Sequence, residues 1–431
     1  MTQPRSSEAP EAAHPAGPKR YNGRSWSWLV LAVLASIPAL VFRLVEITAG
    51  AHPAPAVAAG VFGLGIVGAA FLIAWASEVA QMDISQALAL ALLALVAVLP
   101  EYAVDMVFAW KAGAYPNGLI VDGQFFDYRS YAVANMTGGN RLLVGLGWPL
   151  VALLFWFRRR RALEVGHGIA LELVFLGLAT GYSFFIFFQK HIALWDAGVL
   201  IALFVAYIWL SSRAESKEPE LIGPSAALAS LPKAPRRAVT YGLFIYSALV
   251  ILASAEPFAD GLVEVGKAMN IDEFVLVQWV APIASESPEI LIAAIFTLQG
   301  NGAAAMMALI SAKVNQWTLL VGCIPVVYSI SLGEPAALAM DVRQQEEFLL
   351  TAAQSLFAVV LFIDRRMSWQ GALLLFVLFA SQLFIPSVQA RYIFSFVYLG
   401  LTFVLFLADW RRVPVVARMF RDVVKEAVQA R

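Results

Sequence analysis

The sequence has few of the residues that a soluble protein needs on its surface. Only 14% of its 431 residues are charged, whereas 60% are hydrophobic. Soluble domains carry about 25% charged residues. A chain with so few charges cannot cover a water-exposed surface, so the composition excludes an ordinary soluble domain and indicates an integral membrane protein that contacts the lipid bilayer.

Several kinds of functional motif are also missing. The single cysteine, Cys323, excludes an intramolecular disulfide and a cysteine-based metal cluster. The sequence contains no His-Glu-x-x-His motif and no phosphate-binding loop with Gly-Lys-Ser/Thr, which argues against an intramembrane zinc protease and an ATP-driven pump. The 30 basic residues equal the 30 acidic ones, so no charge excess indicates a nucleic-acid partner. We therefore expect no enzyme and no resident cofactor, and the sequence indicates no protein partner.

Long hydrophobic runs predict an all-α polytopic membrane protein with about twelve transmembrane helices. The runs lie near residues 28–47, 56–78, 84–109, 131–157, 168–188, 192–210, 239–262, 274–298, 303–332, 347–363, 370–386 and 392–408. Each is close to the roughly 20 residues that a bilayer core requires. With twelve spans, the Lys and Arg clusters all fall on one side, which the positive-inside rule makes cytoplasmic. We expect a cell-membrane protein with both termini in the cytoplasm.

Two segments share a pattern in which a Pro-Glu pair interrupts an apolar run. The first is LALVAVLPEYAVDMVFA, with Glu101, and the second is VAPIASESPEILIAAIF, with Glu289. Each is followed by a span that contains Leu-Leu-Val-Gly. We interpret them as parts of two five-helix repeats, and because five is odd the second repeat is inverted. Inverted repeats with broken helices at the midplane are typical of secondary transporters.

The predicted domain organisation follows from these repeats. It comprises a disordered N-terminal tail (1–25), an extra N-terminal transmembrane helix and loop (26–55), the first repeat (56–210), a cytoplasmic linker (211–238), the second repeat (239–386), an extra C-terminal transmembrane helix (387–409) and a basic C-terminal tail (410–431). The basic tail alternates basic and apolar residues, which fits an amphipathic helix on the inner leaflet and a solvated tail equally well.

The Pro-Glu pairs predict a cation site. An ionisable group in the bilayer core is costly and is a functional candidate by default. Proline also frees the carbonyl four residues earlier, and hard cations require oxygen ligands, about six to eight for calcium. Two inverted copies can bring Glu101 and Glu289 face to face at the midplane.

Neighbouring polar residues extend this prediction. Asp105 lies one turn after Glu101, and Glu286 lies one turn before Glu289, between Ser285 and Ser287. Four carboxylates in two broken helices would concentrate negative charge inside the membrane. The alternative for Asp105 and Glu286 is a position near a helix end, where the side chain reaches the interface.

These residues resemble the membrane region of sodium/calcium exchangers, in the cation/Ca2+ exchanger superfamily. That family has two inverted repeats, each with a Ser-Leu-Pro-Glu core followed on the next helix by Gly-Asn-x-x-Gly-Ser-Asn. The matching segments here are Leu99–Glu101, followed by ANMTGGN at residues 134–140, and Ser285–Glu289, within a resemblance that spans roughly residues 56–386. The resemblance implies that Glu101 and Glu289 are central cation ligands, helped by Asn135, Asn140, Ser285 and Ser287. The glycine pair at 138–139 fits close helix approach equally well.

The sequence departs from the family pattern in its charges. Asp105 and Glu286 stand where the family has serine, Lys313 stands where the second repeat would have an asparagine, and Arg141 directly follows Asn140. Lysine carries a compact point charge. We therefore expect Lys313 to pair with Glu289 or Glu286 and to substitute for one transported ion, with Arg141 as a second charge-compensating residue. The alternative is that Lys313 extends towards one membrane surface.

The predicted function is secondary active cation antiport with alternating access. Midplane carboxylates would bind a metal cation or protons, so the transported cations would be Na+, Ca2+ or H+. Two alternatives stay open: a sodium/proton exchanger that does not carry calcium, and a non-transporting scaffold or sensor on an exchanger fold. A channel is less favoured, because inverted repeats are not arranged around a pore axis.

Overall fold

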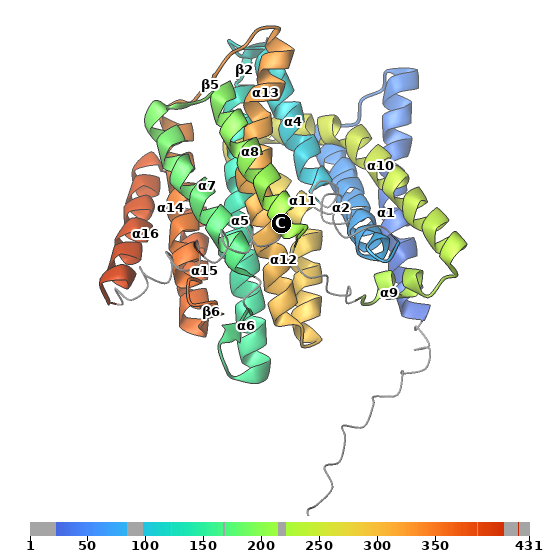
Figure 1. Cartoon of the computed structure of the whole chain (residues 1–431). Helices are drawn as coiled ribbons and strands as arrows, with labels where there is room; N and C mark the ends of the chain where they lie inside the picture. Colours follow the sequence, from blue (N-terminus) through green and yellow to red (C-terminus); the bar gives the residue numbers. More distant parts are fainter. Residues whose placement is uncertain are drawn as a thin grey trace, which may run out of the picture.

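The computed structural model describes residues 23–83, 98–121, 123–166, 169–213, 221–385, 387–408 and 421. Within these ranges the chain forms a bundle of long helices (Figure 1). Helices are the expected solution in lipid, because each one satisfies its own backbone hydrogen bonds. The predictions for most of both chain tails (1–22, 410–420 and 422–431), for the first half of the third span (84–97) and for linker residues 214–220 concern residues outside these ranges.

The first half of the chain begins with the extra helix and continues into the first repeat. Its elements are α1 (Gly23–Ala49), α2 (Pro55–Ala80), α4 (Leu99–Ala114), β1 (Leu119–Val121), β2 (Gln124–Phe126), α5 (Tyr128–Leu142), the π-helical turn η1 (Leu143–Gly147), α6 (Trp148–Arg159), β3 (Leu163–Glu164), α7 (Ala170–Gln189), β4 (His191–Ile192) and α8 (Leu194–Ser211).

The second half has the same order of long helices. Its elements are α9 (Pro224–Ala229), α10 (Lys233–Ala268), α11 (Glu273–Leu298), α12 (Gly302–Asn315), the π-helical turn η3 (Gln316–Leu320), α13 (Val321–Leu332), β5 (Leu338–Ala339), α14 (Val342–Leu361), β6 (Arg366–Met367), α15 (Trp369–Phe384) and α16 (Val388–Ala408).

The helical membrane fold is confirmed, whereas the number of spans stays a prediction. Nine helices of the described residues are long and apolar enough to cross a membrane. Two of them are continuous through a π-helical turn: α5, η1 and α6 form one span of 32 residues, and α12, η3 and α13 form one of 31. Three further helices lie at predicted spans: α15 is shorter, α14 begins with a polar turn, and α4 starts where the described range starts.

Two small antiparallel sheets connect the halves of the molecule. β3 pairs with β6, and β4 pairs with β5. β3 and β4 flank α7 in the first half, while β5 and β6 flank α14 in the second. The strand before each helix therefore pairs with the strand after its counterpart. This reciprocal pairing is what an inverted repeat with a pseudo-twofold axis produces.

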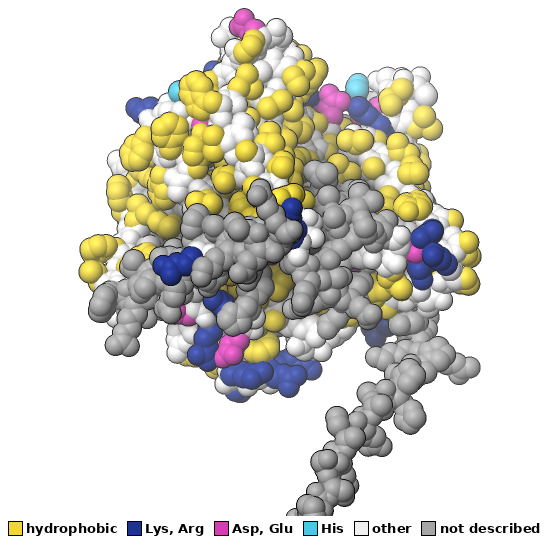
Figure 2. Space-filling model, viewed as in Figure 1, with side chains coloured by type: hydrophobic (Ala, Val, Ile, Leu, Met, Phe, Trp, Pro, Cys, Tyr) yellow, Lys and Arg dark blue, Asp and Glu magenta, His cyan; other side chains and the backbone are white. Residues whose placement is uncertain are grey.

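The bundle has a continuous apolar core and an apolar outer surface. α2 packs on α10, α4 on α13, and α5 on α11, and one cluster of buried side chains links these pairs. α1 and α16 lie at opposite edges of the bundle (Figure 1) and expose side chains such as Leu44 and Phe403. Figure 2 shows hydrophobic side chains over much of the visible flank, with Lys and Arg gathered at its lower end. This surface fits a lipid environment.

The two prolines of the Pro-Glu pairs occupy different positions in their helices. Pro288 lies inside α11, which also contains Pro282. Pro100 lies in the first turn of α4, where the missing N–H would have no intrahelical partner. The predicted break at Pro288 is therefore not seen, because α11 continues through it, whereas Pro100 stands at the start of α4, close to residues that the structure does not describe.

Candidate functional site

Four helices contribute the polar residues that the sequence singled out. Glu101 and Asp105 come from α4, and Asn135 and Asn140 come from α5. The second half supplies Ser285, Glu286, Ser287 and Glu289 from α11, and Lys313 from α12. α11 packs on α4, α5 and α12, so one helix joins residues from both halves.

Gly139 on α5 marks the point where two carboxyl groups meet. A Cβ atom at Gly139 would lie 2.5 Å from Oε1 of Glu286 and 2.8 Å from Oε1 of Glu101. Both glutamates are buried, and no group in the described part of the chain donates a hydrogen bond to their four oxygens. The two carboxyl groups are therefore near neighbours on either side of this position. Unpartnered carboxylates in a dry site require a compensating cation or proton.

The glutamate that faces Glu101 is Glu286, one turn earlier than the predicted Glu289. Glu289 lies within electrostatic range of both, but it is only half-buried. The structure therefore brings together the predicted helices α4 and α11 at Glu101 and Glu286, and the role of Glu289 as a central ligand stays a prediction.

Asp105 and Asn135 form the second part of the site. The Asn135 side-chain amide donates a 2.8 Å hydrogen bond to Oδ1 of Asp105. Oδ2 of Asp105 and Oδ1 of Asn135 have no hydrogen-bond partner among the described residues. Both residues are fully buried. The alternative that Asp105 or Glu286 reaches the interface is wrong, because neighbouring helices cover both side chains.

Lys313 is buried in the protein and does not extend to a membrane surface. Its Nζ donates to Oδ1 of Asn140 at 2.6 Å and to the Asn140 carbonyl at 3.2 Å, and it lies 4.5 Å from the centroid of a Trp317 ring. The predicted ion pair with Glu289 or Glu286 is not formed among the described residues. Lys313 is nevertheless within electrostatic range of Glu286 and Glu101.

The contact between Lys313 and Asn140 joins equivalent positions of the two halves. Asn140 lies three residues before η1, and Lys313 lies three residues before η3. The pseudo-twofold relation therefore brings the two side chains together, and the ammonium of one half satisfies the amide oxygen of the other.

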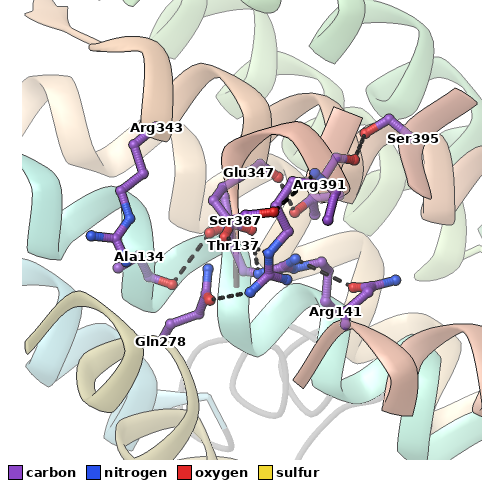
Figure 3. A network of polar contacts seen from close by, with 12 residues as sticks. Ala134, Thr137, Arg141, Gln278, Arg343, Glu347, Ser387, Arg391 and Ser395 are labelled. Atoms are coloured by element: carbon purple, nitrogen blue, oxygen red, sulfur yellow. Dashed lines mark hydrogen bonds and ion pairs between the residues drawn. The ribbon is translucent and has the colours of Figure 1, made fainter. Parts of the chain in front are cut away.

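Arg141 lies in a different network from the predicted one. Its Nη2 contacts Oε2 of Glu347 on α14 at 2.6 Å, and its Nη1 donates to Oε1 of Gln382 at 3.4 Å. Arg391 on α16 contacts the other oxygen of Glu347 (Figure 3). The expectation that Arg141 compensates the midplane carboxylates is therefore wrong, because its guanidinium pairs with Glu347.

The predicted serine ligands are less closely tied to the site. The Ser285 hydroxyl donates to the carbonyls of Ala281 and Pro282 on its own helix, at 3.3 and 3.4 Å. Ser287 is only half-buried. Their roles as ligands stay predictions.

Sequence reasoning missed two polar groups beside the site. Tyr102, next to Glu101, donates a 2.8 Å hydrogen bond to Oδ1 of Asn315 on α12. Gln316 begins η3, is fully buried, and has no partner for its side-chain amide among the described residues. π-helical turns are frequent at functional sites, but their position is not visible in a hydropathy pattern.

The site is not a preformed cluster of three metal-binding side chains. Among the described residues, no three Asp, Glu, His or Cys side chains are arranged to hold a metal ion. A cation between Glu101 and Glu286 would therefore also need amide or carbonyl oxygens, and the free Oδ1 of Asn135 is one such atom.

An ion-pair cluster outside the spans fixes α2 to α10. Arg236 contacts both carboxylate oxygens of Asp83 at 3.0 Å, and Arg237 contacts Oδ1 at 3.1 Å. The hydrogen bond from Arg236 lowers the pKa of Asp83 below its ordinary value. Asp83 follows α2 and both arginines lie in the first turn of α10, so the end of one helix is held to the start of the other.

Comparisons with known proteins identify a family and a fold. The family model described as "Sodium/calcium exchanger protein" matches residues 54–213 and 239–388. The crystal structure of the H+/Ca2+ exchanger CAX is 43% identical, with a TM-score of 0.85 over 94% of this chain and 100% of that chain. A search of curated proteins gives no significant match.

Two more distant structures share the fold. Native YfkE is 13% identical, with a TM-score of 0.59 over 86% of this chain and 99% of that chain. The sodium-calcium exchanger NCX_Mj is 15% identical, with a TM-score of 0.50 over 83% of this chain and 100% of that chain.

Proposed function

The chain belongs to the sodium/calcium exchanger protein family, and on that premise we propose that it exchanges calcium ions for protons across the membrane. The observation that carries this proposal is the pair of buried carboxyl groups of Glu101 and Glu286, which meet at Gly139 with no hydrogen-bond donor among the described residues. The 43% identity to a protein named an H+/Ca2+ exchanger supports the choice of ions.

The chemistry of adjacent carboxylates fits exchange of a cation for protons. Two carboxylates side by side in a dry site repel each other unless a cation or a proton lies between them. A calcium ion would take oxygens from Glu101 and Glu286, with the free oxygens of Asp105 and Asn135 as further candidate ligands. When the ion leaves, protons can replace its charge on the same oxygens. The site then needs no resident cofactor.

Alternating access would expose this site to each side in turn. The inverted halves place the carboxylates between α4, α5 and α11, and rocking of one helix group against another is the usual transport movement for such folds. We further propose that the protein lies in the cell membrane with both termini in the cytoplasm, as the Lys and Arg clusters predict.

Flux measurements in proteoliposomes test the exchange. An outward proton gradient should drive uptake of radioactive calcium, an equal sodium gradient alone should not, and Glu101→Gln should abolish the flux. Glu164→Gln is the matched control, because Glu164 is exposed and, in the part of the chain that the structure describes, forms an ion pair with the exposed Arg366 alone. Calcium uptake driven by sodium alone would contradict proton coupling.

Lys313 favours one second candidate, a sodium/proton exchanger that does not carry calcium. A fixed ammonium near Glu101 and Glu286 reduces the negative charge available to a divalent ion. Proton-driven sodium flux without calcium flux would select this candidate. Absence of both fluxes in folded protein would instead indicate a non-transporting scaffold.

A further inference from the structure

The C-terminal helix α16 has its polar side chains on the inside. Its buried residues are Arg391, Ser395, Tyr398 and Thr402, whereas apolar residues such as Phe403 face outward. The spacing of the four polar residues places them on one helix face, and that face packs against α14. Between helices in lipid, polar contacts and close packing replace the hydrophobic effect. The buried face of α16 therefore has specific partners.

Arg391 is the charged member of that face. Its side chain is 1% exposed. Nε lies 3.4 Å from Oε1 of Glu347, and Nη2 donates to Oε1 of Gln278 on α11 at 3.5 Å. Figure 3 shows the guanidinium groups of Arg391 and Arg141 converging on Glu347, with Gln278 beside them.

Each contact of Arg391 leads to a helix that carries site residues. Glu347 holds Arg141, the residue that follows Asn140 on α5. Gln278 lies on α11 where that helix closely approaches α5, because a Cβ atom at Gly138 would lie 1.9 Å from the Gln278 carbonyl oxygen. The Glu101–Glu286 contact forms one residue further along α5, at Gly139. Arg391 therefore contacts α11 directly and reaches α5 through Glu347 and Arg141. α11 carries Glu286, and α5 carries Gly139, against which the carboxyl groups of Glu286 and Glu101 lie.

We propose that Arg391 is a positioning residue for the cation site, through which the C-terminal helix holds α5 and α11 in register by its contacts with Glu347 and Gln278. This inference rests on the proposed cation site. It assigns a part in exchange to α16, which lies beyond the residues that the family model matches except for its first residue.

The test compares Arg391→Gln with Thr402→Val in the full-length protein. Thr402 lies on the same buried face, but its hydroxyl donates only to the Tyr398 carbonyl of its own helix. Calcium uptake in proteoliposomes gives KM and the maximal rate. Hydrogen–deuterium exchange of the peptide that covers residues 131–142 reports on α5 without any need for transport.

Arg391→Gln should raise KM for calcium by about tenfold, the effect typical of losing a group that orients ion ligands, while the maximal rate changes little. It should also speed deuterium exchange in residues 131–142. Thr402→Val should change neither quantity. Arg391→Lys should recover part of the affinity, because lysine can pair with Glu347 but lacks the planar fork that reaches Gln278 as well.

If Arg391→Gln does not fold, the double variant Arg391→Gln, Glu347→Gln replaces it. The double variant removes one positive and one negative charge, so the net charge equals that of wild type, and it should fold with the same raised KM. Unchanged deuterium exchange of residues 131–142 in Arg391→Gln or in the double variant overturns the inference, as does an unchanged KM for calcium. Absence of calcium flux in the wild-type protein would instead overturn the proposed function, and deuterium exchange would still decide the role of Arg391.

Discussion

Replacement of Gly139 by alanine tests the two-carboxylate site most directly. The new methyl carbon would lie 2.5 Å from Oε1 of Glu286 and 2.8 Å from Oε1 of Glu101, whereas an ordinary contact begins at 3.4 Å. The Glu286 oxygen would therefore have to move by about 0.9 Å and the Glu101 oxygen by about 0.6 Å. A misplacement of about 1 Å at a reacting or binding group can reduce function about 100-fold.

The expected result for Gly139→Ala is a loss of calcium affinity of about 10- to 100-fold. The free energy of unfolding should fall by only about 1–3 kcal/mol, because the methyl overpacks a site whose side chains can adjust. Radioactive calcium uptake in proteoliposomes measures KM, and thermal unfolding in detergent measures stability.

Gly147→Ala is the matched control for this prediction. Gly147 ends η1, eight residues further along the same span, and its added Cβ would meet Leu309 and Ile290 at 3.4 and 3.5 Å, which are ordinary contacts. Both variants gain the same helix propensity, about 1 kcal/mol. A KM for Gly139→Ala equal to that of wild type, or equal shifts in the two variants, would refute the assignment of Gly139 to the site.

Two further predictions concern charged groups on either side of the site. Lys313→Asn removes the ammonium that donates to Asn140, so transport should require an additional cation. The number of charges moved per calcium ion measures this change. An unchanged number would reject the prediction that Lys313 substitutes for one transported ion. Asp83→Asn removes the partner of Arg236 and Arg237, so the variant should melt below wild type at pH 7. The pKa of Asp83 is lowered in the folded protein, so its ion pairs contribute fully to stability above the ordinary aspartate pKa of about 4. This contribution is lost as the pH falls through the lowered pKa. The melting temperatures of wild type and Asp83→Asn should therefore converge in acid. A difference that persists at pH 2 would contradict this reasoning.

The helices could be predicted from the sequence because apolar runs of spanning length have few alternatives in lipid. The first and last residues of each helix were harder to predict from the sequence. The hydropathy pattern predicts a span at 239–262, but α10 runs from Lys233 to Ala268, because its polar ends continue the helix outside the apolar run. The repeated Leu-Leu-Val-Gly motif was a poor guide to register. In the first half it lies mostly within η1, and in the second it begins in η3 and continues into α13.

The composition of the site was easier to predict than its contacts. Glu101 and Asp105 are buried on α4, as their position in a long apolar run suggests. Arg141 was misassigned because one residue turns a helix by about 100°. Asn140 therefore faces α12 while Arg141 faces α14. Which neighbour lies on which side depends on packing between distant segments, and a linear pattern does not contain that information.

The two buried polar systems differ in charge, and the difference indicates which one can exchange ions. The guanidinium groups of Arg141 and Arg391 both contact the single carboxylate of Glu347.

Around Gly139, the buried carboxylates of Glu101, Asp105 and Glu286 outnumber the one ammonium of Lys313. A carboxylate that contacts two guanidinium groups needs no mobile cation and is suited to holding helices together. A system with an excess of buried negative charge is stable only when a cation or protons are present, because an uncompensated charge in a dry interior is strongly destabilising. If the proposed exchange is correct, the exchanged ion is therefore expected to bind at the carboxylates beside Gly139 and not at Glu347.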